Sequence, residues 1–160
     1  MANYVYILLF MLPSEISCAL FCLRRSARVV SQLYDHILAP SGLKSTQYSL
    51  LRIIGLAPVT IGELARFMDM DRTTLARNVR LLEQNDYLNI TAGADKRTRL
   101  LSLTRKGSNA VKDATRYWKQ AQTLLVSDDG FGSERWLALR TELNGIAETG
   151  RRLLATPTGP

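Results

Sequence analysis

Residues 95–105 (Asp-Lys-Arg-Thr-Arg-Leu-Leu-Ser-Leu-Thr-Arg) decide how this chain folds. The run 100–103 within them and the earlier run 88–91 are short segments of strand-type composition, with apolar and polar residues mixed. Ala92-Gly93-Ala94 opens the connection between the two runs, so we expect a β-hairpin. Three basic residues cluster near its tip: Lys96, Arg97 and Arg99.

Two helices joined by a tight turn are predicted ahead of this hairpin. Residues 60–63 (Thr-Ile-Gly-Glu) have the spacing of a capping box, which begins a short helix that ends near Met68. Asp71 can cap the next helix, over about 72–85. A helix pair followed by a hairpin with a cationic tip is a winged helix-turn-helix. That architecture places a helix in the DNA major groove and a basic finger in the adjacent minor groove.

The distribution of charge along the chain also favours a nucleic-acid partner. The chain has 160 residues, 46% of them hydrophobic, and a formal net charge of +7. Residues 44–107 hold eleven basic and six acidic residues, which gives +5 of that total, while each flank contributes +1. A positive charge confined to one segment favours a nucleic-acid partner. A membrane surface would require a basic amphipathic helix, and none stands out in the sequence.

Cysteine usage and the N-terminal segment indicate a cytoplasmic protein. The two cysteines do not form a disulfide framework. The apolar run 5–12 is too short to span a bilayer, and no basic residue precedes it as in a signal peptide. Residues 1–12 are either an arm that packs on a partner subunit or the product of an upstream start site, with Met11 the natural first residue.

Apolar stripes on the terminal helices predict a homodimer. Ile16, Leu20, Leu23, Ala27, Val30, Tyr34 and Ile37 repeat at alternating spacings of four and three, as do Trp136, Leu139, Leu143, Ile146, Gly150 and Leu153 at three and four. Between the hairpin and the last helix, Thr104 can cap a long helix to about Val126. Neither end of the chain is long enough to form a domain, so pairing with a second copy buries both stripes economically. The alternative is that they pack within one subunit.

The expected fold is therefore mainly α. A winged helix-turn-helix with a small antiparallel β-hairpin wing is flanked by long dimerisation helices. We expect an N-terminal arm and dimerisation helix over 1–43, the DNA-binding domain over 44–107, and C-terminal dimerisation helices over 108–160.

The order of these elements resembles the MarR family of bacterial transcription regulators, over roughly residues 14–154. The most specific part is the wing pattern Asp95-x-Arg97, followed by Leu103-Thr104-x-x-Gly107. Residues 71–77 are similar to the family's recognition-helix opening, and residues 38–48 to the link between its first two helices; the first twelve residues depart. The resemblance implies that Arg97 reaches into the minor groove and that Asp95 holds it. It also implies a dimeric repressor that binds a small phenolic or lipophilic ligand, or senses oxidants through cysteine.

Candidate DNA contacts follow from side-chain chemistry. On the expected recognition helix, Thr73, Thr74, Arg77 and Asn78 form one face whose hydroxyl, guanidinium and amide groups suit base-edge readout, with Arg72 beside them. Asp95 fits a bidentate partner for the Arg97 guanidinium. Lys96 and Arg99 suit phosphate contacts.

Other candidates have a structural alternative. Four aromatic side chains are candidates for a ligand pocket, or else core or interface residues: Tyr34, Tyr48, Tyr117 and Trp118, with Trp136 a further candidate. Cys18 and Cys22 are candidate redox residues or small hydrophobic core residues. The single histidine, His36, has no other histidine and no cysteine near it in sequence, so no metal site is expected. No cofactor loop or nucleophile–base pattern stands out, so we predict no enzyme and no cofactor.

The sequence thus predicts a homodimeric repressor of a pseudo-palindromic operator, with double-stranded DNA and a second copy as partners and a small-molecule effector that relieves repression. Two alternatives stay open. One is a cysteine-based redox-sensing regulator, and the other is an effector-independent winged-helix or architectural DNA-binding protein.

Overall fold

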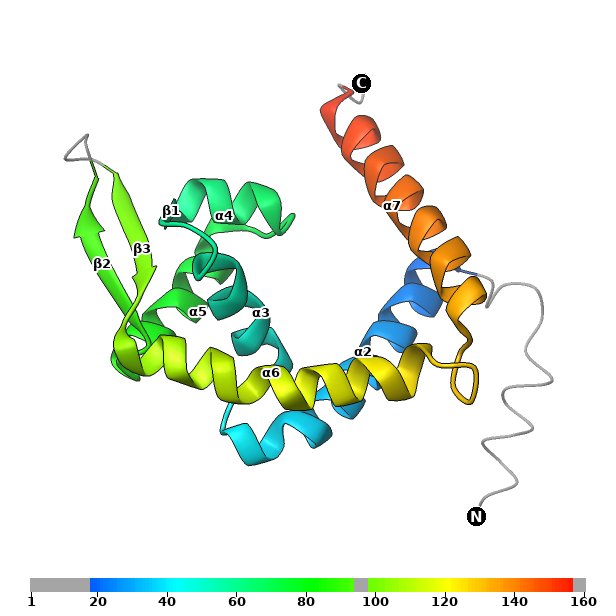
Figure 1. The fold of residues 1–160 in the computed structure, drawn as a ribbon. Coiled ribbons are helices and arrows are strands. Elements are labelled where there is room, and N and C mark those ends of the chain that lie inside the picture. The colour runs from blue at the N-terminus through cyan, green and yellow to red at the C-terminus, as the bar shows by residue number, and fades with distance from the viewer. Residues whose placement is uncertain (1–17, 94–97, 157–160) are drawn as a thin grey trace, which may run out of the picture. The chain divides into compact units, whose positions relative to one another are not determined.

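The structure, a computed structural model, describes residues 18–93 and 98–156 and forms two compact units that meet in sequence at Tyr117 and Trp118 (Figure 1). The element order is α2 (Ala19–Leu38), the 3-10 helix η2 (Ala39–Ser41), α3 (Ser45–Ile54), β1 (Val59–Thr60), α4 (Ile61–Phe67), α5 (Arg72–Gln84), β2 (Leu88–Ala92), β3 (Arg99–Leu103), α6 (Arg105–Val126) and α7 (Ser133–Ala155). Helix α6 runs through both units. The units are described separately below.

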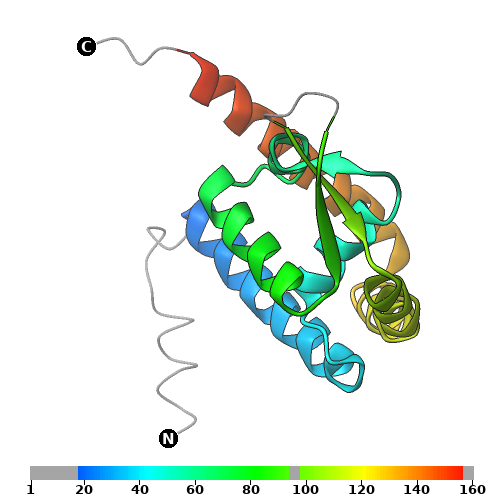
Figure 2. The same ribbon diagram turned by 90° about the vertical axis from the view of Figure 1, so that its left-hand side faces the viewer.

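The predicted hairpin is confirmed, and it carries one more strand than expected. Strands β2 and β3 pair antiparallel, with Leu88 opposite Leu103 and Ala92 opposite Arg99. The two-residue strand β1 pairs with the other edge of β3, Val59 opposite Leu101, so the sheet order is β1-β3-β2. A strand of two residues has no alternation for a sequence reading to detect. Figure 2 shows the hairpin in front of the helices of this unit.

The first unit is built around helices that bury one face each against the sheet. The α5 side chains that point inward are Leu75, Val79 and Leu82, each at most 1% exposed. Other elements of this unit also contribute fully buried side chains: Leu38, Leu51, Leu64 and Leu101. Burial of a leucine side chain stabilises the fold by about 1.5–3 kcal/mol, so these residues fix how the helices pack.

Two predicted helix caps are confirmed by their hydrogen bonds. The Glu63 backbone N–H donates to the Thr60 hydroxyl oxygen at 3.2 Å, and the Thr60 N–H donates to the Glu63 carboxylate at 2.9 Å. The Asp71 carboxylate accepts from the backbone N–H groups of Thr73 and Thr74 at 2.9 and 3.0 Å. These caps set where α4 and α5 begin.

The third predicted cap, at Thr104, also ties α6 to the turn that follows α5. The Thr104 hydroxyl accepts from the Gly107 N–H at 2.9 Å and donates to the Asp86 carbonyl at 2.7 Å. A Cβ atom on Gly107 would overlap the Tyr87 carbonyl oxygen. The close approach of α6 to this turn therefore requires glycine at 107.

Ser45 and Thr46 are residue types that often cap a helix, but they do not cap α3. Ser45 is the first helical residue, and the N-cap is Lys44, whose N–H donates to the Gln47 side chain at 2.9 Å. The Ser45 N–H donates to the Asp35 carboxylate of α2 at 2.6 Å. A side chain distant in sequence thus serves this helix end, which local pattern reading does not reveal.

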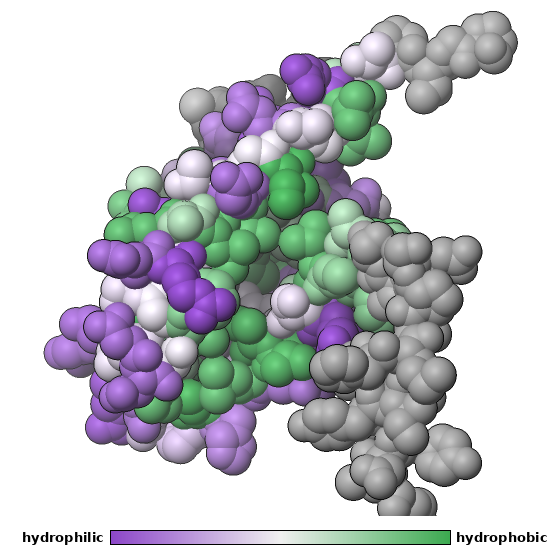
Figure 3. All heavy atoms as spheres, turned by 90° about the vertical axis from the view of Figure 1, so that its right-hand side faces the viewer, coloured by the Kyte–Doolittle hydropathy of each residue, from purple (hydrophilic) through white to green (hydrophobic). Residues whose placement is uncertain are grey.

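The second unit comprises the rest of α6 and helix α7, and α7 has no buried residue. Its apolar side chains Leu137, Ile146 and Leu153 are 53%, 49% and 62% exposed. Helix α2, in the first unit, also exposes Leu20 and Val29, at 62% and 59%. Figure 3 shows hydrophobic side chains at the surface of the face that it views. Within the described residues, no helix is both long and apolar enough to cross a bilayer.

Candidate nucleic-acid interface

Helix α5 presents a polar face that its own core residues orient. Leu75, Val79 and Leu82 anchor one side of the helix in the hydrophobic core. Four predicted DNA-contact residues are exposed: Arg72, Thr73, Thr74 and Arg77. The backbone N–H of Thr74, together with that of Thr73, lowers the pKa of the Asp71 carboxyl. The capping charge therefore persists at neutral pH and fixes the position at which this face begins.

A hollow joins the start of α5 to the base of the wing. Its lining includes Arg72 and Thr73 from α5, and Thr98 and Arg99 from the start of the returning strand. Thr60 also lines it from the start of α4, and none of its described lining residues is acidic. The two guanidinium groups around this hollow provide hydrogen-bond donors for a phosphate group.

The wing extends from this hollow. Arg99 is exposed at the beginning of β3, opposite Ala92. Strands β2 and β3 run away from α6 (Figure 1). The predicted tip residues Asp95, Lys96 and Arg97 lie outside the described residues. Their roles at the tip stay predictions.

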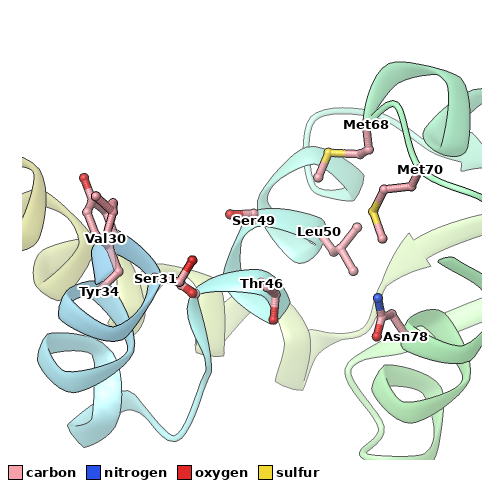
Figure 4. Close-up of a pocket in the computed structure, with 10 residues that line it drawn as sticks. Val30, Ser31, Tyr34, Thr46, Ser49, Leu50, Met68, Met70 and Asn78 are labelled. Atoms are coloured by element: carbon pink, nitrogen blue, oxygen red, sulfur yellow. The ribbon is translucent and has the colours of Figure 1, made fainter. Parts of the chain in front are cut away.

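Asn78 does not lie on the exposed face that is predicted to contact base edges. It is half-buried and lines a different concavity, an open cavity of about 290 Å³ between α2, α3, the α4–α5 turn and α5. Figure 4 shows its amide beside Leu50 and below Met70. Asn78 is three residues after buried Leu75 and four before buried Leu82, so it lies at the edge of the buried stripe.

The walls of the cavity combine apolar and hydroxyl groups. Val30, Leu50, Met68 and Met70 provide the apolar part, and Ser31, Ser45, Thr46 and Ser49 provide hydroxyls. Tyr34 and Asn78 complete the described lining. This mixture of apolar walls and a few hydrogen-bonding groups is typical of small-molecule sites.

The aromatic candidates for a ligand pocket separate into different environments. Tyr34 lines the cavity, and burial raises the pKa of its phenol. Tyr48 is 1% exposed and its hydroxyl lies 3.1 Å from the Thr115 hydroxyl, which makes it a core residue of the first unit. The Tyr117 hydroxyl accepts a hydrogen bond from Arg116 at 2.9 Å. Trp118 and Trp136 are half-buried and belong to the second unit.

The cysteines and the histidine occupy the surface. Cys18 and Cys22 are exposed thiols, so the alternative that they are small hydrophobic core residues is wrong. The redox alternative stays a prediction. His36 is exposed, and the described residues contain no group of three or more side chains able to hold a metal ion.

Several residues at these two concavities were missed by sequence reasoning. The sequence identifies Thr60 as a helix cap but gives no sign that Thr60 and Thr98 line one hollow. Met68 and Met70 flank the turn between α4 and α5, where their side chains line the cavity. Only the three-dimensional position of the turn brings these residues together, and no spacing rule in the sequence marks them.

The chain is similar to known transcription regulators in sequence and in structure. The sequence profile of the MarR family matches residues 41–98, which run from η2 to the base of the wing. A Bacillus subtilis relative, the uncharacterized HTH-type transcriptional regulator YwoH, is 31% identical over 94 residues. That match covers 57% of this chain and 67% of the relative.

Solved structures extend the similarity to the terminal helices. The transcriptional regulator MosR of M. tuberculosis, solved in complex with DNA, is 34% identical with a TM-score of 0.76. That match covers 85% of this chain and 98% of the MosR chain. A mutant MarR from E. coli, complexed with operator DNA, shares the fold at 19% identity and a TM-score of 0.73, over 82% of this chain and 95% of its own.

Proposed function

The chain belongs to the MarR family of DNA-binding transcription regulators, and from this membership we propose that it is a homodimeric repressor. It binds a pseudo-palindromic operator and is released when a small molecule binds. Its family and fold are those of a transcription regulator, not of an enzyme.

The observation that carries this proposal is the hollow between the recognition helix and the wing. Arg72 and Arg99 come from different elements and line the same hollow, next to the exposed α5 face with Thr74 and Arg77. A DNA backbone phosphate at the hollow would fix the register of the helix in the major groove. Side chains on the exposed face would then meet base edges.

Dimerisation is supported by the apolar surface of α7 and α2. Each unit, taken alone, exposes members of the predicted apolar stripes: Leu20 of α2, and Ile146 and Leu153 of α7. Monomeric proteins rarely expose large apolar patches. A two-fold dimer covers them and presents two recognition helices to half-sites about one helical turn apart. The DNA-bound structure of MosR is that of a protein similar over most of its length.

Release by a small molecule is supported by the cavity beside α5. A ligand that binds more tightly to a form with unsuitable recognition-helix spacing lowers the affinity for DNA by that difference in binding free energy. The cavity touches α5 through Asn78, and α2 through Tyr34. A ligand there therefore contacts both the DNA-reading element and one of the helices proposed to form the dimer.

Selection of bound sequences from random DNA tests the proposal most directly. We expect an inverted repeat with half-site centres about 10–10.5 base pairs apart or a multiple of that spacing. Sedimentation of the complex should give two chains per site. Recovery of asymmetric sites bound by one chain would contradict the dimeric repressor.

Variants of the two DNA-facing elements separate readout from anchoring. Arg97→Ala should weaken operator binding by about 1–3 kcal/mol, as for loss of a well-placed arginine contact, with the fold intact, and Asp95→Ala should cause a smaller loss. Arg77→Ala should reduce the preference for operator over scrambled DNA, whereas Lys96→Ala should weaken both equally. Wild-type operator affinity in Arg97→Ala, or an equal loss on both DNAs in Arg77→Ala, would refute the assigned role.

A further inference from the structure

We propose that Cys18 and Cys22, at the start of α2, together bind one soft monovalent cation of the copper(I) or silver(I) class through their two sulfur atoms. No residue that lines the hollow beside the wing or the cavity beside α5 takes part in this site, so it goes beyond the proposed function. The inference rests on the spacing of the two thiols, their exposure and their place on the helix. Its test requires no DNA.

The two thiols lie one helical turn apart. The Cys22 backbone N–H donates to the Cys18 carbonyl oxygen at 3.1 Å, which is the hydrogen bond of the first turn of α2. Side chains four residues apart on a helix have Cβ atoms about 5–6 Å apart. A disulfide requires about 3.5–4.5 Å between these atoms, so the regular helix keeps the two sulfurs from bonding directly to each other. A cation between the sulfurs spans the gap, because a metal–thiolate bond is about 2.3 Å long.

The number and type of the ligands select the class of cation. Thiolates are soft ligands, and they favour copper(I) over hard cations such as magnesium or calcium. Within residues 18–93 and 98–156, no group of three or more histidine, cysteine or carboxylate side chains is placed to hold a metal ion. Structural zinc sites use four ligands, so two sulfurs on one helix suit instead a cation that accepts two-coordinate geometry.

The place of the thiols at a helix N-terminus offsets the charge of the complex. On binding, both thiol protons leave to solvent, two metal–sulfur bonds form, and the cation keeps its single positive charge. The bound group therefore carries one negative charge. Helix α2 is 20 residues long with no acidic residue in its first turn, so its N-terminal dipole favours that charge. Arg25, exposed and three residues after Cys22, adds a positive charge on the same side of the helix.

The thiols remain accessible in the proposed dimer, because they lie on the other side of α2 from its apolar stripe. Both cysteines are exposed. Leu20 of the stripe is two residues from each cysteine, which is about 200° around a helix of 3.6 residues per turn. A partner subunit that covers Leu20, which is 62% exposed in the single chain, therefore leaves the thiols open to solvent.

Competition with a coloured chelator measures binding to the full-length chain. Copper(I) is supplied under nitrogen as its bicinchoninate complex, whose absorbance falls as the protein takes the ion. We expect one copper(I) per chain. Cys18→Ser and Cys22→Ser should each lower the affinity about a hundredfold or more, because two ligands on one scaffold act at a high effective concentration. One ion per two chains, or wild-type affinity in either variant, would overturn the site.

Two variants with the same composition as wild type test the spacing. Ser26 is exposed and lies one turn after Cys22, so an exchange of cysteine and serine moves one thiol along α2. Cys22→Ser with Ser26→Cys leaves thiols at 18 and 26, about 12 Å apart along the helix, and should bind as weakly as Cys22→Ser alone. Cys18→Ser with Ser26→Cys restores the four-residue spacing at 22 and 26, and should bind within about tenfold of wild type. With wild-type circular dichroism in both variants, tight binding by the first or weak binding by the second would overturn the proposal.

Discussion

The first unit and helix α7 use apolar residues in opposite ways. Every buried hydrophobic residue of the described chain lies between Leu38 and Ala121, and the largest of them form the core that α3, α4, α5 and the sheet share. Helix α7 is 23 residues long, has apolar side chains at helical spacing, and buries none of them. The first region carries the contacts that define its fold within one chain. The second has an apolar face whose burial requires another surface.

The largest expected effect comes from a charge on the exposed apolar face of α7. Ile146→Asp should disrupt the proposed dimer, because each of two symmetric copies loses about 1.5–3 kcal/mol of side-chain burial. Sedimentation at several concentrations measures the change. Asn144→Asp adds a charge at an exposed polar position of the same helix and serves as the control. A folded Ile146→Asp protein that remains dimeric would show that this face is not an interface.

A core truncation in the first unit should have a different signature. Leu75 is 0% exposed, so Leu75→Ala should lower the free energy of unfolding by about 2–5 kcal/mol. The loss should be seen in urea denaturation of the first unit. It should not vary with protein concentration once dimer dissociation is taken into account. A loss below 1 kcal/mol would mean that α5 is anchored less firmly than its burial indicates.

A smaller effect is expected where α6 approaches the turn that follows α5. Gly107→Ala places a methyl group against the Tyr87 carbonyl and should cost about 1–3 kcal/mol, despite the higher helix propensity of alanine. Ser108→Ala, at the adjacent exposed position, should stay within about 0.5 kcal/mol of wild type. If thermal unfolding showed Gly107→Ala to be as stable as Ser108→Ala, the close approach of α6 to the turn would be refuted.

The smallest expected effect is a dependence on acid that originates in the caps of the first unit. The pKa of Asp71 is lowered by the backbone N–H of Thr74, and that of Glu63 is lowered by the Thr60 hydroxyl. A lowered folded-state pKa means that the stabilisation is complete above the unfolded-state pKa, and is lost as the pH falls through the folded-state pKa. Asp71→Asn retains a capping acceptor but does not titrate. Its unfolding free energy should fall less between pH 5 and pH 2 than that of wild type, and an identical pH profile would contradict the assignment.

Much of the first unit was predictable from the sequence because its signals are local. Thr60 with Glu63, Asp71, and Thr104 are each a few residues from the backbone groups that they cap, and all three predictions are confirmed. The hairpin was predicted from composition and turn residues in the same way. Features that depend on distant segments were missed. The Asp35 carboxylate that serves the start of α3 is ten residues away.

The same difference between local and distant interactions explains which residues of the candidate site could be predicted. The exposure of Arg72, Thr73, Thr74 and Arg77 follows from helical periodicity, and the structure agrees with it. Asn78 was placed with them because it follows Thr74 by four residues, but it also borders the stripe of Leu75 and Leu82, and burial on that side prevails. The four aromatic pocket candidates could not be ranked from sequence. Aromatic side chains occur both in protein cores and in ligand cavities, so residue type does not distinguish the two. Of the four candidates, only Tyr34 lines the cavity between α2, α3 and α5.

The pairing of β1 with β3 has a consequence for how the domain opens. Val59 lies opposite Leu101, so this ladder closes a loop of chain that contains all of α4, α5 and β2. The recognition helix α5 therefore lies, along the chain, between two strands that pair with each other. Within this loop α5 contacts the edge strand β2, and α4 contacts both α5 and the other edge strand β1. In native-state hydrogen exchange, the amides of α5 and the three strands should thus exchange as one cooperative group, while those at the ends of α7 exchange earlier.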